Sequence, residues 1–89
     1  MSEQTLKIIN EKGLHARASA KFVEVAEAFD ASVQVSKDGM NVSGDSIMGL
    51  LMLGAFRGTS IQITTSGTQA DALMEALQAL IENKFGEDF

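Results

Sequence analysis

The dipeptide Asp38-Gly39 constrains the fold of this chain more than any other stretch of its sequence. It joins two short runs, "SVQVSK" and "MNVS", in which apolar and polar residues alternate. The commonest two-residue connection between strands is the type I′ turn, which needs positive φ at both positions, and Asp-Gly is one of its preferred pairs. The sequence therefore predicts two antiparallel strands paired by a tight hairpin.

Two more strands are expected, one on either side of this hairpin in the sequence. Leu6 and Ile8 alternate with polar residues within 5–10, and Ile61 and Ile63 do so within 59–66. A period of two is typical of a strand with one buried face. Residues 10–13 indicate a turn after the first strand, in which Gly13 allows the backbone to bend tightly.

Three helices are expected between and after these strands. The helix over 16–29 has an apolar stripe wide enough to cover a sheet, formed by Ala18, Phe22, Val25, Ala26 and Phe29. A short helix fits within 45–58, after the N-cap candidates Asp45 and Ser46. Thr68, with Asp71 three residues later, predicts the cap of a last helix, which Gly86 would end; its stripe is Ala70, Leu73, Leu77, Leu80 and Ile81. The order of elements indicates an α+β fold, a two-layer sandwich with helices on one face of a four-stranded sheet.

Composition excludes several kinds of protein. Eighty-nine residues without a linker or repeat are expected to form one domain over 1–89. The chain has no cysteine and one histidine, so we expect no disulfide, metal site or cofactor. A net charge of −5 without Trp or Tyr argues against nucleic acid as a partner. No apolar run is long enough for a membrane span or signal peptide, so we expect a cytoplasmic protein that is not bound to membranes.

The single histidine, His15, lies at the predicted start of the helix over 16–29, in the segment "GLHARASA". The backbone N–H groups of Ala16, Arg17 and Ala18 would lie in the first turn, where unpaired donors and the helix dipole favour an anion. The guanidinium of Arg17 matches phosphate oxygens, and Lys21 adds positive charge one turn later. These groups suit a neutral imidazole that accepts a phosphoryl group and releases it. The alternative is a helix-capping or exposed histidine without chemistry.

The short helix within 45–58 has too many apolar residues for one buried face. If Leu50 and Leu53 point into the core, four others must point largely outward, namely Ile47, Met48, Leu51 and Met52. We interpret these four, together with Ala20 and Lys21, as a partner-docking surface, because a chain of this length cannot bury them all. The alternative is a core helix packed on both sides. The acidic end "GEDF" is expected to fray and to have no chemical role.

The motifs "GLHARASA" and "SIMGLLML" together resemble the HPr family, the histidine-containing phosphocarrier proteins of the bacterial phosphotransferase system. The likeness covers essentially the whole chain. It implies an open-faced β-sandwich whose antiparallel sheet has strand order 1-4-2-3 and is covered by three helices. It also implies a carrier rather than an enzyme: His15 takes phosphate on Nδ1 from phosphorylated enzyme I and gives it to an EIIA-type protein, with Arg17 as the phosphate's partner. Ala18 stands where the family usually has proline.

Ser46 has two compatible interpretations. It is a plain N-cap, or it is also the serine that HPr kinase/phosphorylase modifies in some family members. Glu24, Glu27 and Gly49 occupy positions where sugar-branch members often carry lysines, so the chain looks more like the nitrogen-regulatory (NPr) branch or a regulatory HPr. The alternative functions are an NPr-like regulatory module that acts by binding alone, and a small acylphosphatase-like hydrolase that would not need His15. We expect a monomer.

Overall fold

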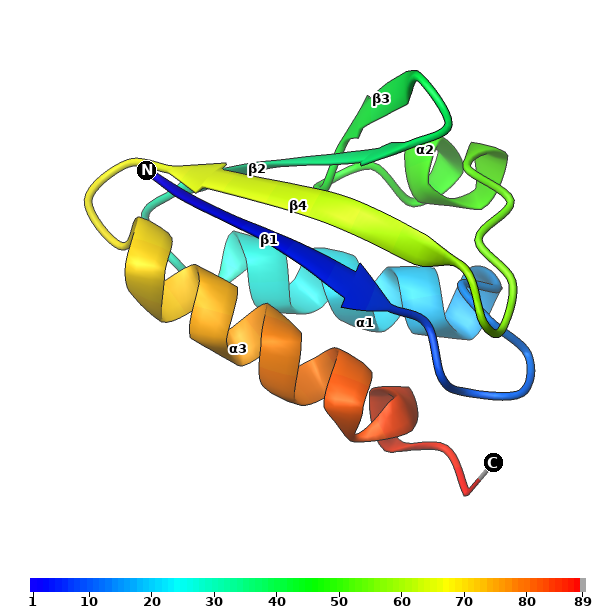
Figure 1. The fold of residues 1–89 in the computed structure, drawn as a ribbon. Coiled ribbons are helices and arrows are strands. Elements are labelled where there is room, and N and C mark those ends of the chain that lie inside the picture. The colour runs from blue at the N-terminus through cyan, green and yellow to red at the C-terminus, as the bar shows by residue number, and fades with distance from the viewer. Residues whose placement is uncertain (89) are drawn as a thin grey trace.

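The computed structural model describes residues 1–88, which form a four-stranded antiparallel sheet with helices packed against it (Figure 1). The strands are β1 (Ser2–Lys7), β2 (Ser32–Lys37), β3 (Met40–Ser43) and β4 (Ser60–Ser66). The helices are α1 (Ala16–Glu27), α2 (Ile47–Met52) and α3 (Ala70–Glu82), followed by the 3-10 turn η1 (Lys84–Gly86). The strand order is β1-β4-β2-β3, with every pair antiparallel. This confirms the fold class and the strand order that the family resemblance implies.

The hairpin between β2 and β3 forms as the Asp-Gly dipeptide predicts. Asp38 has φ of +51° and Gly39 has φ of +84°, the signs that a type I′ turn requires. Lys37 lies directly opposite Met40, so the connection contains two residues. The local sequence is therefore sufficient to set this part of the sheet.

Strand β1 begins and ends three residues earlier than predicted. It pairs with β4 from Ser2, opposite Thr65, to Lys7, opposite Ser60. Ile8 follows the strand and is buried, and its backbone bonds with the turn before β4 through Thr59 and Gly58. The prediction over 5–10 was wrong because it relied on apolar alternation. The polar residues at the start of β1 join the sheet through their backbone pairing with β4, and the Glu3 carboxylate also accepts from the Thr64 hydroxyl at 3.3 Å.

Helix α1 covers the sheet with a stripe that is shifted slightly from the predicted one. Ala18, Phe22 and Ala26 are buried, whereas Val25 and Phe29 are partly buried and pack at the edge of the core. Val23, which was not included in the predicted stripe, is buried instead. The helix also ends at Glu27, two residues before the predicted end. The shift follows from the position of α1 between α2 and α3, both of which it contacts.

Helix α3 begins after Gln69, so the cap predicted at Thr68 is wrong. Gln69 makes no capping hydrogen bond and binds instead to the end of the α1–β2 connection. Its side-chain oxygen accepts from the Asp30 N–H at 2.7 Å, and its own N–H donates to the Asp30 carbonyl at 3.0 Å. A pairing with a residue 39 positions away decides where this helix starts, and no local motif reveals it.

Helices α1 and α3 lie side by side beneath the sheet, and α2 packs on α1 and β3 (Figure 1). The core between the layers contains fully buried residues from both, among them Phe22, Leu50, Ile61, Ile63 and Leu77. The chain returns after α3 to the loop that joins β1 to α1, so the C-terminal turn lies beside the start of α1 (Figure 1). No helix in residues 1–88 is both long enough and apolar enough to span a bilayer.

Candidate functional site

The loop between β1 and α1 is held tightly against the segment that precedes β4. The N–H of Leu14 donates to the carbonyl of Ala55 at 2.9 Å. Gly13 has φ of +65°, and a Cβ atom there would lie 2.5 Å from the Ala55 carbonyl oxygen, so only glycine fits. Asn10 is fully buried and closes the turn by donating from Nδ2 to the Gly13 carbonyl at 2.8 Å. This turn, predicted at Gly13, brings His15 to the start of α1.

His15 is the N-cap residue of α1, with an extended backbone of φ −80° and ψ −176°. Its carbonyl accepts the Ser19 N–H at 2.8 Å, whereas its imidazole makes no capping hydrogen bond. The helix itself provides no acceptor for the first-turn N–H groups, which in this chain are those of Ala16, Arg17 and Ala18. The first two of these residues are exposed and the third is buried. The ring of His15 is therefore not bonded to the helix, and His15 directly precedes these donors at the positive end of α1.

A carboxylate from the other end of the chain binds the imidazole. Nε2 of His15 is hydrogen-bonded to Oε2 of Glu87, and the two side chains are 27% and 14% exposed. The second oxygen of Glu87, Oε1, accepts from Nδ2 of Asn10 at 2.9 Å. Burial by itself raises the pKa of the Glu87 carboxyl. The hydrogen bonds from Asn10 and His15, with the positive charges of His15 and Lys12, outweigh burial and hold that pKa below its ordinary value of 4.5.

This contact corrects the expectation that the end "GEDF" frays without a role. Glu87 lies in the site, and Phe85 just before it is fully buried, with its carbonyl accepting from Nζ of Lys21 at 2.7 Å. Phe89 lies outside the described residues. Sequence reasoning missed Glu87 because its partner is 72 positions away and an acidic end is typical of a frayed terminus. The one signal was a large apolar residue, Phe85, beyond the end of the last helix.

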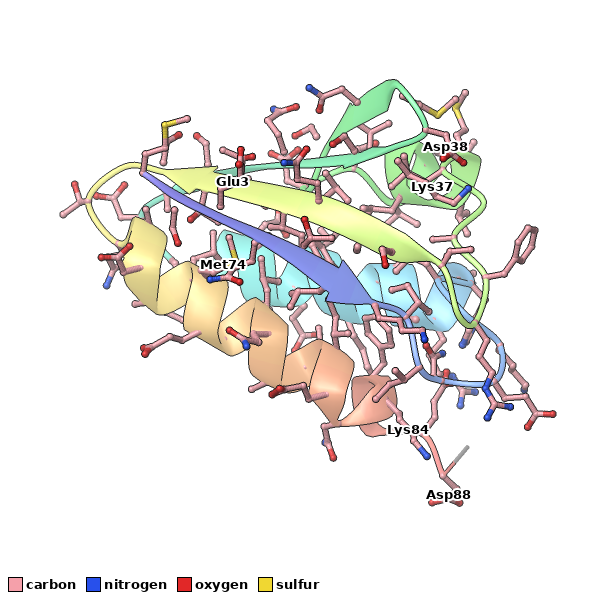
Figure 2. All side chains as sticks on the ribbon, viewed as in Figure 1. Glu3, Lys37, Asp38, Met74, Lys84 and Asp88 are labelled. Atoms are coloured by element: carbon pink, nitrogen blue, oxygen red, sulfur yellow. The ribbon has the colours of Figure 1, made fainter. Side chains whose placement is uncertain are left out.

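These groups surround an open pocket of about 260 Å³. It is lined by Glu11, Lys12, His15, Arg17, Lys21, Gly86, Glu87 and Asp88. Figure 2 shows Lys84 and Asp88 at this end of the molecule, where the chain terminates below the loop that leads into α1. The pocket gives the imidazole a path to solvent, and Lys12 and Arg17 add positive charge close to the ring. A small anion therefore has access to the ring, where the basic residues Lys12, Arg17 and Lys21 share the pocket with the carboxylates Glu11, Glu87 and Asp88.

A comparison with protein families identifies the family of this chain. The family described as "PTS-HPr: PTS HPr component phosphorylation site" matches residues 2–83, which include His15 and the complete sheet. The chain belongs to the HPr family. HPr proteins are phosphocarriers of the phosphotransferase system, and this chain has that role. The alternative of an acylphosphatase-like hydrolase is thereby set aside.

Relatives match this chain over nearly its whole length. "Phosphocarrier protein HPr" of Neisseria meningitidis serogroup A is 48% identical over 87 residues, which cover 98% of each chain. The crystal structure of HPr-C-His from Thermoanaerobacter tengcongensis has a TM-score of 0.95 at 40% identity and covers 100% of both chains. The HPr dimer from the same organism has a TM-score of 0.78 at 41% identity, covering 98% of this chain and 100% of that one.

Helix α2 presents the outward apolar residues that its composition predicts. Leu50 and Leu53 are buried, whereas Ile47, Met48, Leu51 and Met52 are exposed, Met48 by 68% and Met52 by 65%. Phe56, in the loop after α2, is 69% exposed and was not predicted. We call these five exposed residues the apolar patch. The loop that carries Phe56 also borders the loop before the histidine, because a Cβ atom on Gly13 would lie 3.0 Å from the Cα of Phe56.

Ser46 is the N-cap of α2, which confirms the first of its two interpretations. Its backbone is extended, with φ of −115° and ψ of 111°, and its Oγ accepts from the Gly49 N–H at 3.0 Å. Asp45, the other candidate, accepts instead from the hydroxyl of Ser43 at 2.5 Å. The hydroxyl of Ser46 therefore lies directly before Ile47 and Met48, the first two residues of the apolar patch.

Proposed function

We propose that His15 is the residue that carries the phosphoryl group and that Nδ1 is the atom that accepts it. The observation that carries this proposal is the position of the imidazole at the first turn of α1, where it opens on a pocket with Lys12 and Arg17. Its Nε2 is already bound by Glu87, so Nδ1 is the nitrogen left for attack. The chain makes and breaks one N–P bond and leaves most of the catalysis to its partners, as a carrier rather than an enzyme.

The incoming phosphate has two kinds of donor within reach of the ring. The N–H groups of Ala16, Arg17 and Ala18 lie at the positive end of α1, and the Arg17 side chain supplies a fork of donors matched to phosphate oxygens. Arg17 and Ala16 are exposed, so these contacts are made at the surface. A shallow site of this kind binds the phosphate weakly enough to release it, which a carrier requires.

We assign two successive protein partners, phosphorylated enzyme I as donor and an EIIA-type protein as acceptor. The docking surface for both consists of the apolar patch and the exposed Ala20 of α1. Lys21 lies at the edge of this surface. Its ammonium is held in place by its hydrogen bond to the Phe85 carbonyl. Exposed Met and Phe side chains without paired charges favour docking by apolar burial. These encounters take place in the cytoplasm, where phosphoenolpyruvate is available to enzyme I.

We further assign regulation to Ser46 through HPr kinase/phosphorylase. A phosphate on this Oγ adds nearly two negative charges directly before Ile47 and Met48. The N-cap position accommodates the charge because it lies at the N-terminus of a helix, whereas an apolar interface does not. Phosphorylation of Ser46 would therefore leave the fold intact and weaken docking.

The carrier function is tested with phosphoenolpyruvate, enzyme I and this chain. We expect one acid-labile, base-stable phosphate per chain, which the His15→Ala variant lacks and the Glu82→Ala control retains. Phosphate that persists in His15→Ala, or that wild type never receives, contradicts the assignment. The alternative of an NPr-like module that acts by binding alone predicts full activity in His15→Ala.

The working unit is one domain over residues 1–89, acting as a monomer. A dimer, if the chain formed one, would use the exposed apolar patch as its interface. Light scattering from micromolar to millimolar protein tests this point. A mass of about 9.5 kDa throughout is expected, and a constant doubled mass contradicts it.

A further inference from the structure

The C-terminal turn is folded back onto the site at some conformational cost. Lys84 and Phe85 have φ of +56° and +57°, a left-handed backbone that residues other than glycine adopt rarely. Two packed contacts hold this turn in place. Phe85 is fully buried in the core, and its carbonyl accepts from Nζ of Lys21 in α1 at 2.7 Å. Backbone strain of this kind concentrates at functional sites and persists where surrounding contacts enforce it.

The strained turn places Glu87 between Asn10 and His15, and the three side chains are joined by hydrogen bonds. Oε1 accepts from the buried amide of Asn10 at 2.9 Å, which leaves Oε2 oriented toward Nε2 of the imidazole. Asn10 is itself fixed by its bond to the Gly13 carbonyl. The carboxylate thus has a fixed position rather than the freedom of a surface side chain.

The chemistry of this contact determines the form of the ring. The pKa of the Glu87 carboxyl lies below its ordinary value, so the group is ionised near neutral pH and only accepts hydrogen bonds. Nε2 of His15 must therefore carry the hydrogen. In the neutral imidazole the other nitrogen then has a free electron pair.

We propose that Glu87 is a positioning residue for phosphoryl transfer, which holds His15 in the Nε2–H form and keeps the lone pair on Nδ1. This inference rests on the proposed function of His15. As the Nδ1 electron pair attacks phosphorus, the N–P bond to His15 forms and the bond from phosphorus to the donor atom breaks, with its electron pair staying on the donor. The hydrogen on Nε2 stays in its bond to Glu87. The positive charge that develops on the ring is offset by the adjacent carboxylate.

Other charged groups face the same pocket and do not replace Glu87. They are Glu11, Lys12, Arg17, Lys21 and Asp88. Within residues 1–88, Glu87 is the one carboxylate with a hydrogen bond to the imidazole. The basic residues favour the phosphate, whereas Glu87 acts on the ring that receives it.

The first test is ¹⁵N NMR of the His15 ring in unphosphorylated protein, at a pH where the imidazole is neutral. We expect the Nε2–H tautomer alone in wild type and in the control Glu82→Ala, which changes an exposed glutamate outside the pocket. In Glu87→Ala the Nδ1–H tautomer becomes populated, and in Glu87→Gln, which keeps an acceptor oxygen, it is populated less. An unchanged tautomer in Glu87→Ala overturns the proposal. This holds even if the variant is less stable than wild type.

The second test is the rate at which the same variants accept phosphate from enzyme I. We expect kcat/KM to fall about tenfold in Glu87→Ala, which corresponds to about 1.4 kcal/mol, with Glu87→Gln between it and wild type. A wild-type kcat/KM in Glu87→Ala overturns the positioning role while phosphate still appears on His15. If instead wild type accepts no phosphate, the carrier assignment fails, and the positioning role fails with it whatever the tautomer result.

Discussion

The buried amide of Asn10 donates to the Glu87 carboxylate over 2.9 Å and joins two residues that are 77 positions apart in the sequence. The same Nδ2 also donates to the Gly13 carbonyl, so one side chain fixes both the loop before His15 and the carboxylate that binds its ring. The site is therefore built from segments near both ends of the sequence. Removing this amide is expected to loosen both segments together.

Asn10→Ala should therefore lower the free energy of unfolding by about 1–3 kcal/mol, because a buried carbonyl and a carboxylate lose their donor. Urea denaturation at neutral pH measures the change. The matched control is Asn41→Ala on exposed strand β3, which is expected to stay within about 0.5 kcal/mol of wild type. Equal losses in the two variants would show that the buried amide contributes nothing.

Gly13→Ala should be more destabilising than Gly54→Ala. Both glycines have positive φ, +65° and +63°, so each alanine costs about 1–2 kcal/mol of backbone strain. At Gly54 the new methyl group meets no atom within 4 Å, whereas at Gly13 it lies 2.5 Å from the Ala55 carbonyl oxygen. The steric conflict adds about 1–3 kcal/mol. Thermal unfolding of the two variants in parallel measures the difference in stability. Equal stabilities would show that the loop moves freely enough to avoid the steric conflict.

Acid should remove the stabilisation that Glu87 provides. Its pKa is lower in the folded chain than the ordinary 4.5, so its contribution is complete above that pH and is lost as the pH falls below it. We expect the difference in unfolding free energy between wild type and Glu87→Gln to shrink below about pH 4.5. Denaturant titrations from pH 5 to pH 3 measure it, with Glu82→Gln as the control. A difference that grows on acidification contradicts the lowered pKa.

Substitution of Ser46 should separate its capping role from its regulatory role. Ser46→Ala loses the hydrogen bond from Gly49 and about 1 kcal/mol of stability, whereas Ser46→Asp keeps a capping acceptor. Phosphorylation kinetics with enzyme I then report docking. We expect slower transfer to Ser46→Asp and nearly normal transfer to Ser46→Ala. The regulatory assignment is wrong if the aspartate variant accepts phosphate as fast as wild type.

Phe56→Ser should weaken docking without affecting the fold. Phe56 is 69% exposed and borders the loop before His15, so its loss removes contact area for a partner and little from the core. We expect KM for this chain in the enzyme I reaction to rise about tenfold, equivalent to about 1.4 kcal/mol. Met40→Ser, an exposed residue of the β2–β3 hairpin, is the control and should leave KM unchanged.

The features that were predicted correctly depend on residues close together in the chain. The hairpin at Asp38-Gly39 and the cap at Ser46 follow from the backbone preferences of a few neighbouring residues. The outward direction of Met48 and Met52 follows from helical spacing and from the limited core of a small domain. The position of His15 at a helix start is local in the same sense. The motif around His15 and the motif in α2 were sufficient to identify the family.

Tertiary structure alone decided the groups that complete the site and the exact limits of the elements. Glu87 reaches His15, and Gln69 pairs with Asp30, because the order of the strands brings distant segments together. Phe56 lies near the histidine loop for the same reason. Local preference and periodicity describe short-range energetics, whereas these contacts depend on how the layers pack, and a pattern of residues along the chain does not contain that information.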